Sequence, residues 1–278
     1  MLKVDSHHHL WKYDANALPW ITDDLSVIKN DYFPADLKPY LEKFRIQYTV
    51  AVEARLSLWE TTFLLEQAAL NPFIAGVVGW LDLSADDLEV NLQWFNRFPK
   101  LVGLRHRFEG SSFIQDIENL KFIQGVKLLK KYNLTYDIMC VEEHLPAVIK
   151  FTNHFEDQKM VLDHVAKPLI KKGTISPWKD QIQTLARNQN IFCKVSGLVT
   201  EADWDKWQEE DIKPYLDVVS DAFGTERLIF GSDWPVCLLA ANYERVYNII
   251  NHYLEQFSAE EQEKIWGLNA KNFYNLDI

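Results

Sequence analysis

Short apolar segments rich in β-branched residues recur along the chain, and each is separated from the next by enough residues to form a helix. There are eight such segments, at residues 2–7, 46–54, 74–83, 101–108, 134–140, 159–165, 191–198 and 227–234. Apolar residues at helical spacing lie between some of them, at 58–71, 119–133 and 141–155. Strands that alternate with helices indicate right-handed βαβ units and a parallel sheet.

Eight parallel strands are the number that closes an α/β barrel of the (β/α)8, or TIM, type. An open, doubly wound sheet is the alternative, but no G-x-G-x-x-G follows the first strand, which disfavours its dinucleotide-binding form. No repeat, low-complexity tract or linker marks a second domain, so we expect one domain over residues 1–278. The long, aromatic-rich connection at residues 10–45 is expected to fold over the mouth of the barrel.

The composition argues against several classes of partner. The net charge is −11, and no block of Lys or Arg offers the basic surface that nucleic acids require. No apolar run approaches the roughly 20 residues that cross a bilayer, and no secretory leader is recognisable, so we expect a cytoplasmic protein. Cys140, Cys193 and Cys237 form no C-x-x-C motif, which fits buried, reduced thiols. The sequence leaves the oligomeric state open, with a homodimer among the options.

Polar residues gather where the predicted strands end, and this is the end at which TIM barrels carry their active sites. Burial of such groups costs free energy unless they have a partner or a purpose. The set comprises Asp5, His7 and His9; Glu53 and Arg55; Arg105, His106 and Arg107; Asp163, His164 and Lys167; Lys194 and Ser196; and Ser232, Asp233 and Trp234.

Three consecutive histidines lie in the first segment, within VDSHHHLW at residues 4–11. Because side chains alternate along a strand, His7 and His9 share one face and His8 points to the other. If Asp5, His7 and His9 face the lumen, His8 packs outward and has a structural role. A His-x-His pair at a strand end suits a metal site or two imidazoles around a substrate. A remnant of an expression tag is disfavoured, because the run is short and lies inside a strand pattern.

The segment FGSDWP, residues 230–235, places Asp233 at a strand end, where its carboxylate can act as a general base toward water. A helix cap or a turn is the structural alternative for such an aspartate. His164 and the pair Arg105 and Arg107 could polarise a carbonyl or bind an anion, because an arginine fork donates two parallel hydrogen bonds. One of the two arginines is expected to reach the substrate.

Several further residues have two interpretations each. Glu53 is either a metal ligand or a salt-bridge partner of Arg55 or Arg105. Lys194 either reaches the substrate from the lumen or belongs to a structural ion pair. The tryptophans near the mouth either stack on the apolar face of a sugar ring or fill the rim of the barrel; they are Trp11, Trp20, Trp80 and Trp234.

Five short motifs also match a known family in their order and separation: VDSHHHLW, VGLRH, VLDHVAKP, KVSGL and FGSDWPV. Together they resemble the amidohydrolase-related group of the amidohydrolase superfamily, which includes sugar lactone hydrolases and 2-pyrone-4,6-dicarboxylate lactonase, over nearly the whole chain. The resemblance implies a distorted TIM barrel that hydrolyses a lactone, a cyclic ester. It also implies catalytic roles for the residues at the matched positions and an anion- or carbonyl-binding role for Arg105; the catalytic set is His7, His9, His164 and Asp233.

One departure from the superfamily bears on the metal. Binuclear members carry a carboxylated lysine or a glutamate on strand four and a histidine on strand five, whereas this chain offers Arg105 and the histidine-free LTYDIMC. We therefore expect at most one divalent cation, with Zn²⁺ favoured, and catalysis without a metal stays open. The candidate ligands are His7, His9, Glu53 and Asp233.

These residues give a hypothesis for the reaction. Asp233 takes a proton from water, the water attacks a lactone carbonyl, and the imidazoles, with or without a cation, stabilise the oxyanion. A sugar acid lactone such as L-fuconolactone or L-rhamnonolactone is favoured over an aromatic pyrone. Two alternatives stay open: a metal-dependent decarboxylase on a related barrel, and a non-catalytic barrel that binds sugar acids. The expected substrate-binding residues are Arg105, Lys194, Trp11 and Trp234.

Overall fold

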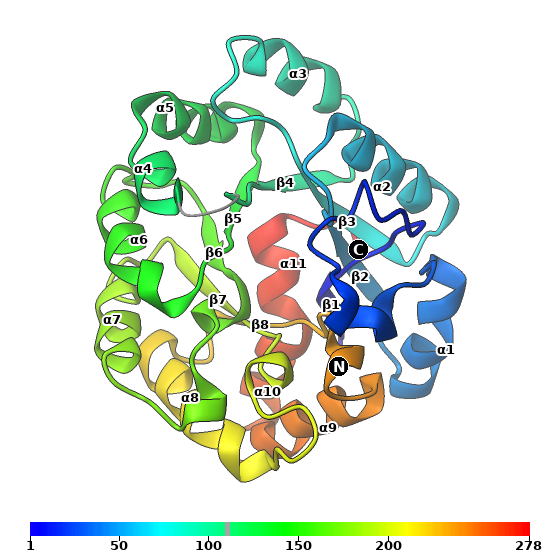
Figure 1. Cartoon of the computed structure of the whole chain (residues 1–278), viewed down its shortest axis with the longest axis vertical. Helices are drawn as coiled ribbons and strands as arrows, with labels where there is room; N and C mark the ends of the chain where they lie inside the picture. The colour runs from blue at the N-terminus through cyan, green and yellow to red at the C-terminus, as the bar shows by residue number, and fades with distance from the viewer. Residues whose placement is uncertain (109–111) are drawn as a thin grey trace.

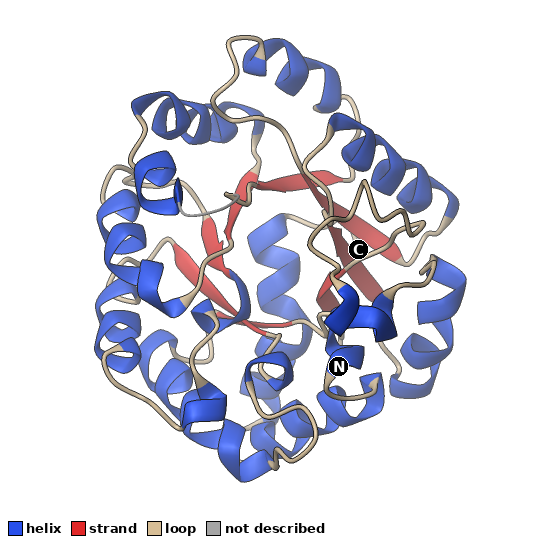
Figure 2. Ribbon diagram, viewed as in Figure 1, coloured by secondary structure: helices blue, strands red, loops and turns tan. Residues whose placement is uncertain are grey.

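Eight parallel strands form one sheet in the order β1 to β8 in the computed structural model, which describes residues 1–108 and 112–278. Backbone hydrogen bonds from His9 N to Trp234 O (2.7 Å) and from Asp233 N to His7 O (2.8 Å) join its two edges at the strand ends. Figures 1 and 2 show the strands as a ring surrounded by helices. The expected TIM barrel is confirmed. The strands are β1 Val4–His8, β2 Tyr48–Val52, β3 Ile74–Gly79, β4 Leu101–Arg105, β5 Thr135–Ile138, β6 Met160–Leu162, β7 Ile191–Val195 and β8 Leu228–Phe230.

Helices follow the strands, and all but the last α-helix, Asn269–Tyr274, pack on the outside of the ring (Figure 2). The α-helices are α1 Pro34–Phe44, α2 Leu58–Leu70, α3 Leu88–Phe95, α4 Phe113–Ile117, α5 Leu120–Leu129, α6 Leu145–Thr152, α7 Trp178–Leu185, α8 Glu209–Phe223, α9 Tyr243–Leu254, α10 Ala259–Glu263 and α11 Asn269–Tyr274. Shorter helices are η1 Asp23–Ile28, η3 Lys130–Tyr132, η4 Glu142–His144, η5 Asp163–Ala166, η6 Ile170–Lys172, η7 Val199–Glu201, η8 Val236–Leu239 and η9 Lys264–Leu268.

The ends of the helices follow local sequence signals. Ser57 caps α2, because its side chain accepts a hydrogen bond from Glu60 N in the first turn, and α2 fills the predicted range 58–71 almost completely. The range 119–133 contains α5 and η3, whereas 141–155 divides into η4 and the shorter α6.

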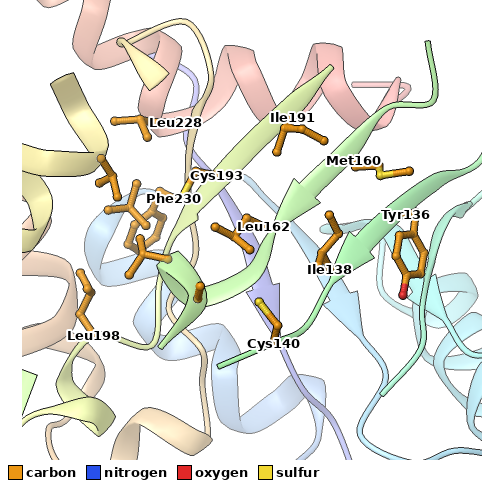
Figure 3. Packing of buried hydrophobic residues seen from close by; sticks show 14 of the residues in the cluster. Tyr136, Ile138, Cys140, Met160, Leu162, Ile191, Cys193, Leu198, Leu228 and Phe230 are labelled. Carbon is orange, nitrogen blue, oxygen red and sulfur yellow. The ribbon is translucent and has the colours of Figure 1, made fainter. Parts of the chain in front are cut away.

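The two faces of each strand carry different side chains. Residues at alternate positions of β5 to β8 pack outward against the helices, and Figure 3 labels several of them, including Ile138, Leu162 and Cys193. The intervening positions face the lumen, where valines of the other strands meet the C-terminal helix α11. Figure 1 shows α11 in the middle of the ring, and its contacts with β1 and β8 place it against the barrel. The lumen is therefore a packed interior.

The long connection between β1 and β2 has two parts. The first part, up to Tyr32, forms a loop that is closed by two backbone hydrogen bonds between Trp11 and Tyr32. This loop covers the mouth of the barrel, as expected. The remainder is α1, which belongs to the outer ring of helices, so the expectation for 10–45 is confirmed only for the first part. Over the described residues, none of the helices combines the length and the apolar character that a membrane crossing needs.

Candidate active site

Three imidazoles surround one carboxylate at the carboxyl ends of the strands. Oδ1 of Asp233 lies 3.4 Å from Nε2 of His9 and 3.8 Å from Nε2 of both His7 and His164. The two histidines of β1 also approach each other, with 3.3 Å between their Nε2 atoms. All four side chains are buried, with at most 4% of their surface exposed. The four residues expected to be catalytic therefore lie together; their roles stay predictions.

The middle histidine has the structural place that alternation predicts. Nε2 of His8 lies 2.9 Å from Oγ1 of Thr49 on the neighbouring strand, and the ring is fully buried. Asp5 departs from the alternation, because its carboxylate accepts hydrogen bonds from Ser232 N and from the Tyr243 hydroxyl on α9. The pairing of β1 with β2 is irregular between Asp5 and His8, and this irregularity breaks the two-residue period.

The backbone around His164 has an unusual conformation. His164 and the three residues after it all have positive φ angles, between 47° and 62°, and form one left-handed turn. Left-handed helical geometry costs about 1–2 kcal/mol per residue for side chains other than glycine. Asp233 also has a positive φ of 56°. Strain of this kind concentrates at functional sites, where the surrounding structure over-determines the conformation.

Two glycines make room for the imidazoles. A Cβ atom on Gly231 would lie 2.6 Å from Cβ of His7, closer than real contacts allow. Gly197 has a φ of +61°, and a Cβ there would lie 2.6 Å from Nδ1 of His164. Glycine is required at both positions because Cβ of His7 and the ring of His164 approach the backbone so closely.

The outer ring nitrogens of two histidines have partners that orient the rings. Nδ1 of His9 lies 2.9 Å from the carbonyl oxygen of Val52, which can only accept, so this nitrogen carries the proton. Nδ1 of His164 lies 2.9 Å from Oγ of Ser196. Both rings therefore direct Nε2 toward Asp233.

The surroundings fix the charges of the cluster. Burial lowers the pKa of His164 to about 4, against the opposing attraction of Asp233. Burial and the nearby Lys194 cation hold the pKa of His7 well below its ordinary value. Burial acts in the opposite direction on Asp233, but His164, His9 and His7 outweigh it and keep the pKa of this carboxyl below its usual range. At neutral pH the cluster therefore holds a carboxylate beside the neutral imidazoles of His7 and His164.

The donor set fits one divalent cation. One ligand atom from each of His7, His164 and Asp233 can be chosen so that all lie within 4.8 Å of one another. Ligand atoms about 2.1 Å from a tetrahedral zinc ion are separated by about 3.4 Å, and the separations of 3.3 to 3.8 Å within the cluster are close to this value. His9 lies close to His7 and Asp233 but does not belong to this set of mutually close atoms.

Glu53 is not part of this set, and its prediction as a metal ligand is corrected. Its Oε1 lies 2.7 Å from Nε of Arg105 and 3.3 Å from Nε of Arg107. The alternative interpretation, a salt-bridge partner of Arg105, is what the structure shows. The two positively charged guanidinium groups offset the negative charge of this carboxylate and so weaken its attraction for a metal cation.

A layer of charged side chains lies beneath His7 in the lumen. Arg105 Nη1 lies 3.1 Å from Oδ2 of Asp163, and Lys194 Nζ lies 3.0 Å from Oδ1 of the same carboxylate. Lys194 also pairs with Asp137, which accepts a hydrogen bond of 2.8 Å from the Tyr274 hydroxyl on α11. The prediction that Arg105 and Lys194 contact the substrate is corrected, because carboxylates surround both cations and Lys194 has no exposed surface.

The tryptophans predicted to stack on the substrate are structural. Trp11 is fully buried, and its indole N–H donates to the carbonyl oxygen of Asn30. Trp234 is 1% exposed and packs edge-on against Tyr32. Both belong to the packing that holds the β1–β2 connection over the mouth, so neither offers a face to a substrate. Their prediction as substrate-binding residues is corrected.

A cavity of about 500 Å³ lies at the same end of the barrel, lined by residues that follow β1, β2, β4 and β5 and by none of the four clustered residues. Its polar lining consists of Arg55, Arg107 and His144, and its apolar lining includes Trp20 and Met139. Arg107 therefore lines the cavity, whereas Arg105 does not. This volume lies within the usual range for small-molecule sites.

The sequence reasoning missed three residues. His144 lines the cavity, but it lies beyond a strand end in η4 and gives no strand signal. Asp137 is a single charged residue within an apolar strand, and a buried charge of this kind indicates a partner inside the barrel. Tyr274 comes from the C-terminal helix, and no motif connects it with the lumen.

Comparison with known proteins identifies the family. A family model described as amidohydrolase matches residues 4–276. An L-fucono-1,5-lactonase of Burkholderia multivorans is 38% identical over 99% of this chain and 96% of its own length. The chain belongs to the amidohydrolase family. An L-fucono-1,5-lactonase of Burkholderia ambifaria is 32% identical to this amidohydrolase over 99% of the chain and 96% of the relative.

Solved structures agree with this membership. The crystal structure of an amidohydrolase from Burkholderia multivorans with bound zinc matches with a TM-score of 0.96 at 38% identity, and the match covers 99% of this amidohydrolase and 100% of that chain. A probable 2-pyrone-4,6-dicarboxylic acid hydrolase from Acinetobacter baumannii matches with a TM-score of 0.78 over 99% of this chain and 100% of that one. At 15% identity the second match shows a shared fold alone.

Proposed function

We propose that this amidohydrolase opens a sugar acid lactone, with L-fucono-1,5-lactone as the substrate to test first. The observation that carries the proposal is the buried carboxylate of Asp233 with three imidazole Nε2 atoms 3.4 to 3.8 Å from its Oδ1. The two L-fucono-1,5-lactonases that are 38% and 32% identical along nearly the full chain support the choice of substrate.

The geometry supplies a base and hydrogen-bond donors for ester hydrolysis. Asp233 accepts a proton from water while the water oxygen bonds to the lactone carbonyl carbon. An imidazole that carries its proton on Nε2 donates it to the carbonyl oxygen and stabilises the negative charge that develops there. The bond from that carbon to the ring oxygen then breaks, and the ring oxygen takes the proton from Asp233. The product is an open hydroxy acid, whose carboxyl group loses its proton to the solvent.

One zinc ion would be held by His7, His164 and Asp233, with His9 beside them. When bound, such a cation polarises the carbonyl group and lowers the pKa of water. The cavity would hold the sugar ring, with Arg55 and Arg107 toward its hydroxyl groups and Trp20 and Met139 against its apolar face.

Acid release from a panel of aldono-1,4- and 1,5-lactones and a pyrone dicarboxylate, followed with a pH indicator, tests the proposal. We expect turnover of L-fucono-1,5-lactone by the wild type and a loss of at least about 100-fold in Asp233→Asn. Asp86→Asn, which changes an exposed aspartate that pairs with Lys121 and does not line the cavity, is the matched control and should retain full activity. Equal rates for the wild type and Asp233→Asn would contradict the mechanism, and release of CO2 in place of acid would favour a decarboxylase.

We also propose a role in carbohydrate metabolism within a reducing, cytoplasmic compartment. Cys140, Cys193 and Cys237 are all free and buried, which suits a compartment where thiols stay reduced. Co-purification with cytosolic markers after cell fractionation tests this placement, and recovery in a secreted or periplasmic fraction would contradict it.

A further inference from the structure

Lys194 is a fully buried cation next to a catalytic candidate, and the reaction as proposed gives it no role. Its Nζ lies 3.1 Å from Nδ1 of His7 and forms ion pairs with Asp137 and Asp163. A buried ammonium group is costly unless it is paired, and these neighbours compensate it. Its contact with His7 is the one that reaches the reacting centre.

An ammonium group can only donate hydrogen bonds. When Nδ1 of His7 accepts from Lys194, the closest polar group to it at 3.1 Å, the single proton of a neutral imidazole resides on Nε2. That nitrogen lies 3.3 Å from Nε2 of His9, whose Nδ1 donates to Val52. Arg105 Nη1 also lies 3.3 Å from Nε2 of His7 and can only donate, so this contact favours a lone pair on Nε2 and opposes Lys194, although it is longer than the 3.1 Å from Nη1 to Asp163.

We infer that Lys194 holds the proton of His7 on Nε2, so that His7 presents a hydrogen-bond donor at the mouth and binds zinc less tightly than its position allows. A metal ligand must present a lone pair at the nitrogen that faces the ion. The inference rests on the proposed zinc site, and it makes Lys194 a positioning residue that acts through His7.

Asp163 has the opposite effect on the same nitrogen. Its Oδ1 lies 3.4 Å from Nδ1 of His7 and can accept a proton from it. A proton on Nδ1 leaves the lone pair on Nε2, which is the form that ligates a metal, and carboxylates behind histidine ligands strengthen metal binding in this way. Lys194 and Asp163 therefore compete for Nδ1, and the outcome decides between a donor and a ligand.

Two variants with opposite expected effects test the inference in the full-length protein. Lys194→Met combined with Asp137→Asn removes one cation and one anion, so the net charge of the lumen is unchanged. We expect this double variant to bind Zn²⁺ at least about 10-fold more tightly in competition with a chromophoric chelator. Asp163→Asn keeps the shape of its side chain and should weaken Zn²⁺ binding by about 10- to 100-fold.

Nitrogen NMR of metal-free protein labelled at histidine reads the tautomer directly, with the His7 signals assigned by their loss in His7→Gln. We expect a protonated Nε2 in the wild type and a protonated Nδ1 in the double variant. Asp137→Asn alone changes a carboxylate that does not contact His7, so we expect His7 to keep the same tautomer as in the wild type. If the double variant does not fold, the zinc affinity of Asp163→Asn still tests the inference.

A protonated Nδ1 in the wild type would overturn the inference. Weaker zinc binding in both variants would also overturn it, because a merely structural role damages the site in one direction only. The NMR measurement needs neither lactone nor metal. A failure of the wild type to turn over any lactone would therefore contradict the proposed function and leave the inference about His7 standing.

Discussion

The imidazole of His164 occupies space that any side chain on Gly197 would fill. A Cβ atom there would lie 2.6 Å from Nδ1 of the ring and 2.8 Å from Cγ. The same nitrogen is 2.9 Å from Oγ of Ser196, so a shifted ring would also lose this partner.

Gly197→Ala is therefore expected to displace His164 and reduce kcat for the lactone by about 100-fold, since a displacement of about 1 Å in a reacting group has an effect of that size. Steady-state kinetics on L-fucono-1,5-lactone measures it. Gly173→Ala is the matched control, because its φ of +64° imposes similar backbone strain while nothing lies within 4 Å of the new methyl group. Similar activities in the two variants would contradict the steric argument.

Arg107 is expected to bind the substrate, because it lines the cavity and its partner Glu53 is shared with Arg105. Loss of a hydrogen bond to a charged group costs about 1.5–3 kcal/mol. Arg107→Met should raise KM by about 10- to 100-fold with a smaller effect on kcat. Arg97→Met provides the control, since this arginine lies over the exposed Trp94 away from the cavity. An unchanged KM in Arg107→Met would exclude the contact.

Glu60 should make the stability of the protein depend on pH. Burial raises the pKa of this carboxyl from 4.5 to about 7, although Ala54 N donates a hydrogen bond of 2.9 Å to it. Between these two pH values the folded state retains a proton that the unfolded state has lost, so the free energy of unfolding falls as pH rises. The slope from one such group is about 1.4 kcal/mol per pH unit at most.

Urea denaturation at several pH values measures this effect. Glu60→Gln should remove the dependence, so that its stability relative to the wild type increases from pH 4.5 to about 7 and then stays constant. Glu66→Gln, at an exposed position of the same helix α2, should follow the wild type. Parallel curves for Glu60→Gln and the wild type would show that Glu60 is not the group responsible.

Trp11 should matter for stability and not for substrate binding. Trp11→Phe removes the hydrogen bond to Asn30 and part of a fully buried ring, with an expected loss of about 1–3 kcal/mol. Thermal denaturation and KM for the lactone are the two readouts, and KM should change little. A large rise in KM at unchanged stability would restore the stacking role that the sequence suggested.

The sequence predicts the fold well because a barrel repeats one signal eight times. Each of the eight β-branched segments forms a strand, and the strands lie within their predicted ranges except β1, which ends at His8, one residue beyond the predicted range 2–7. Helix ends were harder to place, because local signals decide them: the range 141–155 divides at Leu145, where α6 begins after η4 with Pro146 in its first turn.

The candidate site divides into a predictable and an unpredictable part. The end of each strand places His7, His164 and Asp233 at one mouth, and this follows from topology alone. Topology does not predict how deep a side chain lies within the lumen. Arg105 and Lys194 were therefore expected to contact the substrate, whereas both lie among carboxylates deeper in the barrel. The sequence also does not distinguish a tryptophan at the rim of the barrel from one in its interior. The buried Trp11 and Trp234 were therefore predicted to contact the substrate.

The alternation of β7 restricts how the barrel can assemble. Cys193 packs among the outer helices, whereas Lys194 meets Asp137 and Asp163 in the lumen. A slip of this strand by one residue would exchange the two positions and place an unpaired ammonium group in apolar surroundings. Apolar side chains tolerate such an exchange far better, because their attraction has no direction. The buried ions thus act as a check on strand register, and misaligned barrels are excluded by the same charges that surround His7.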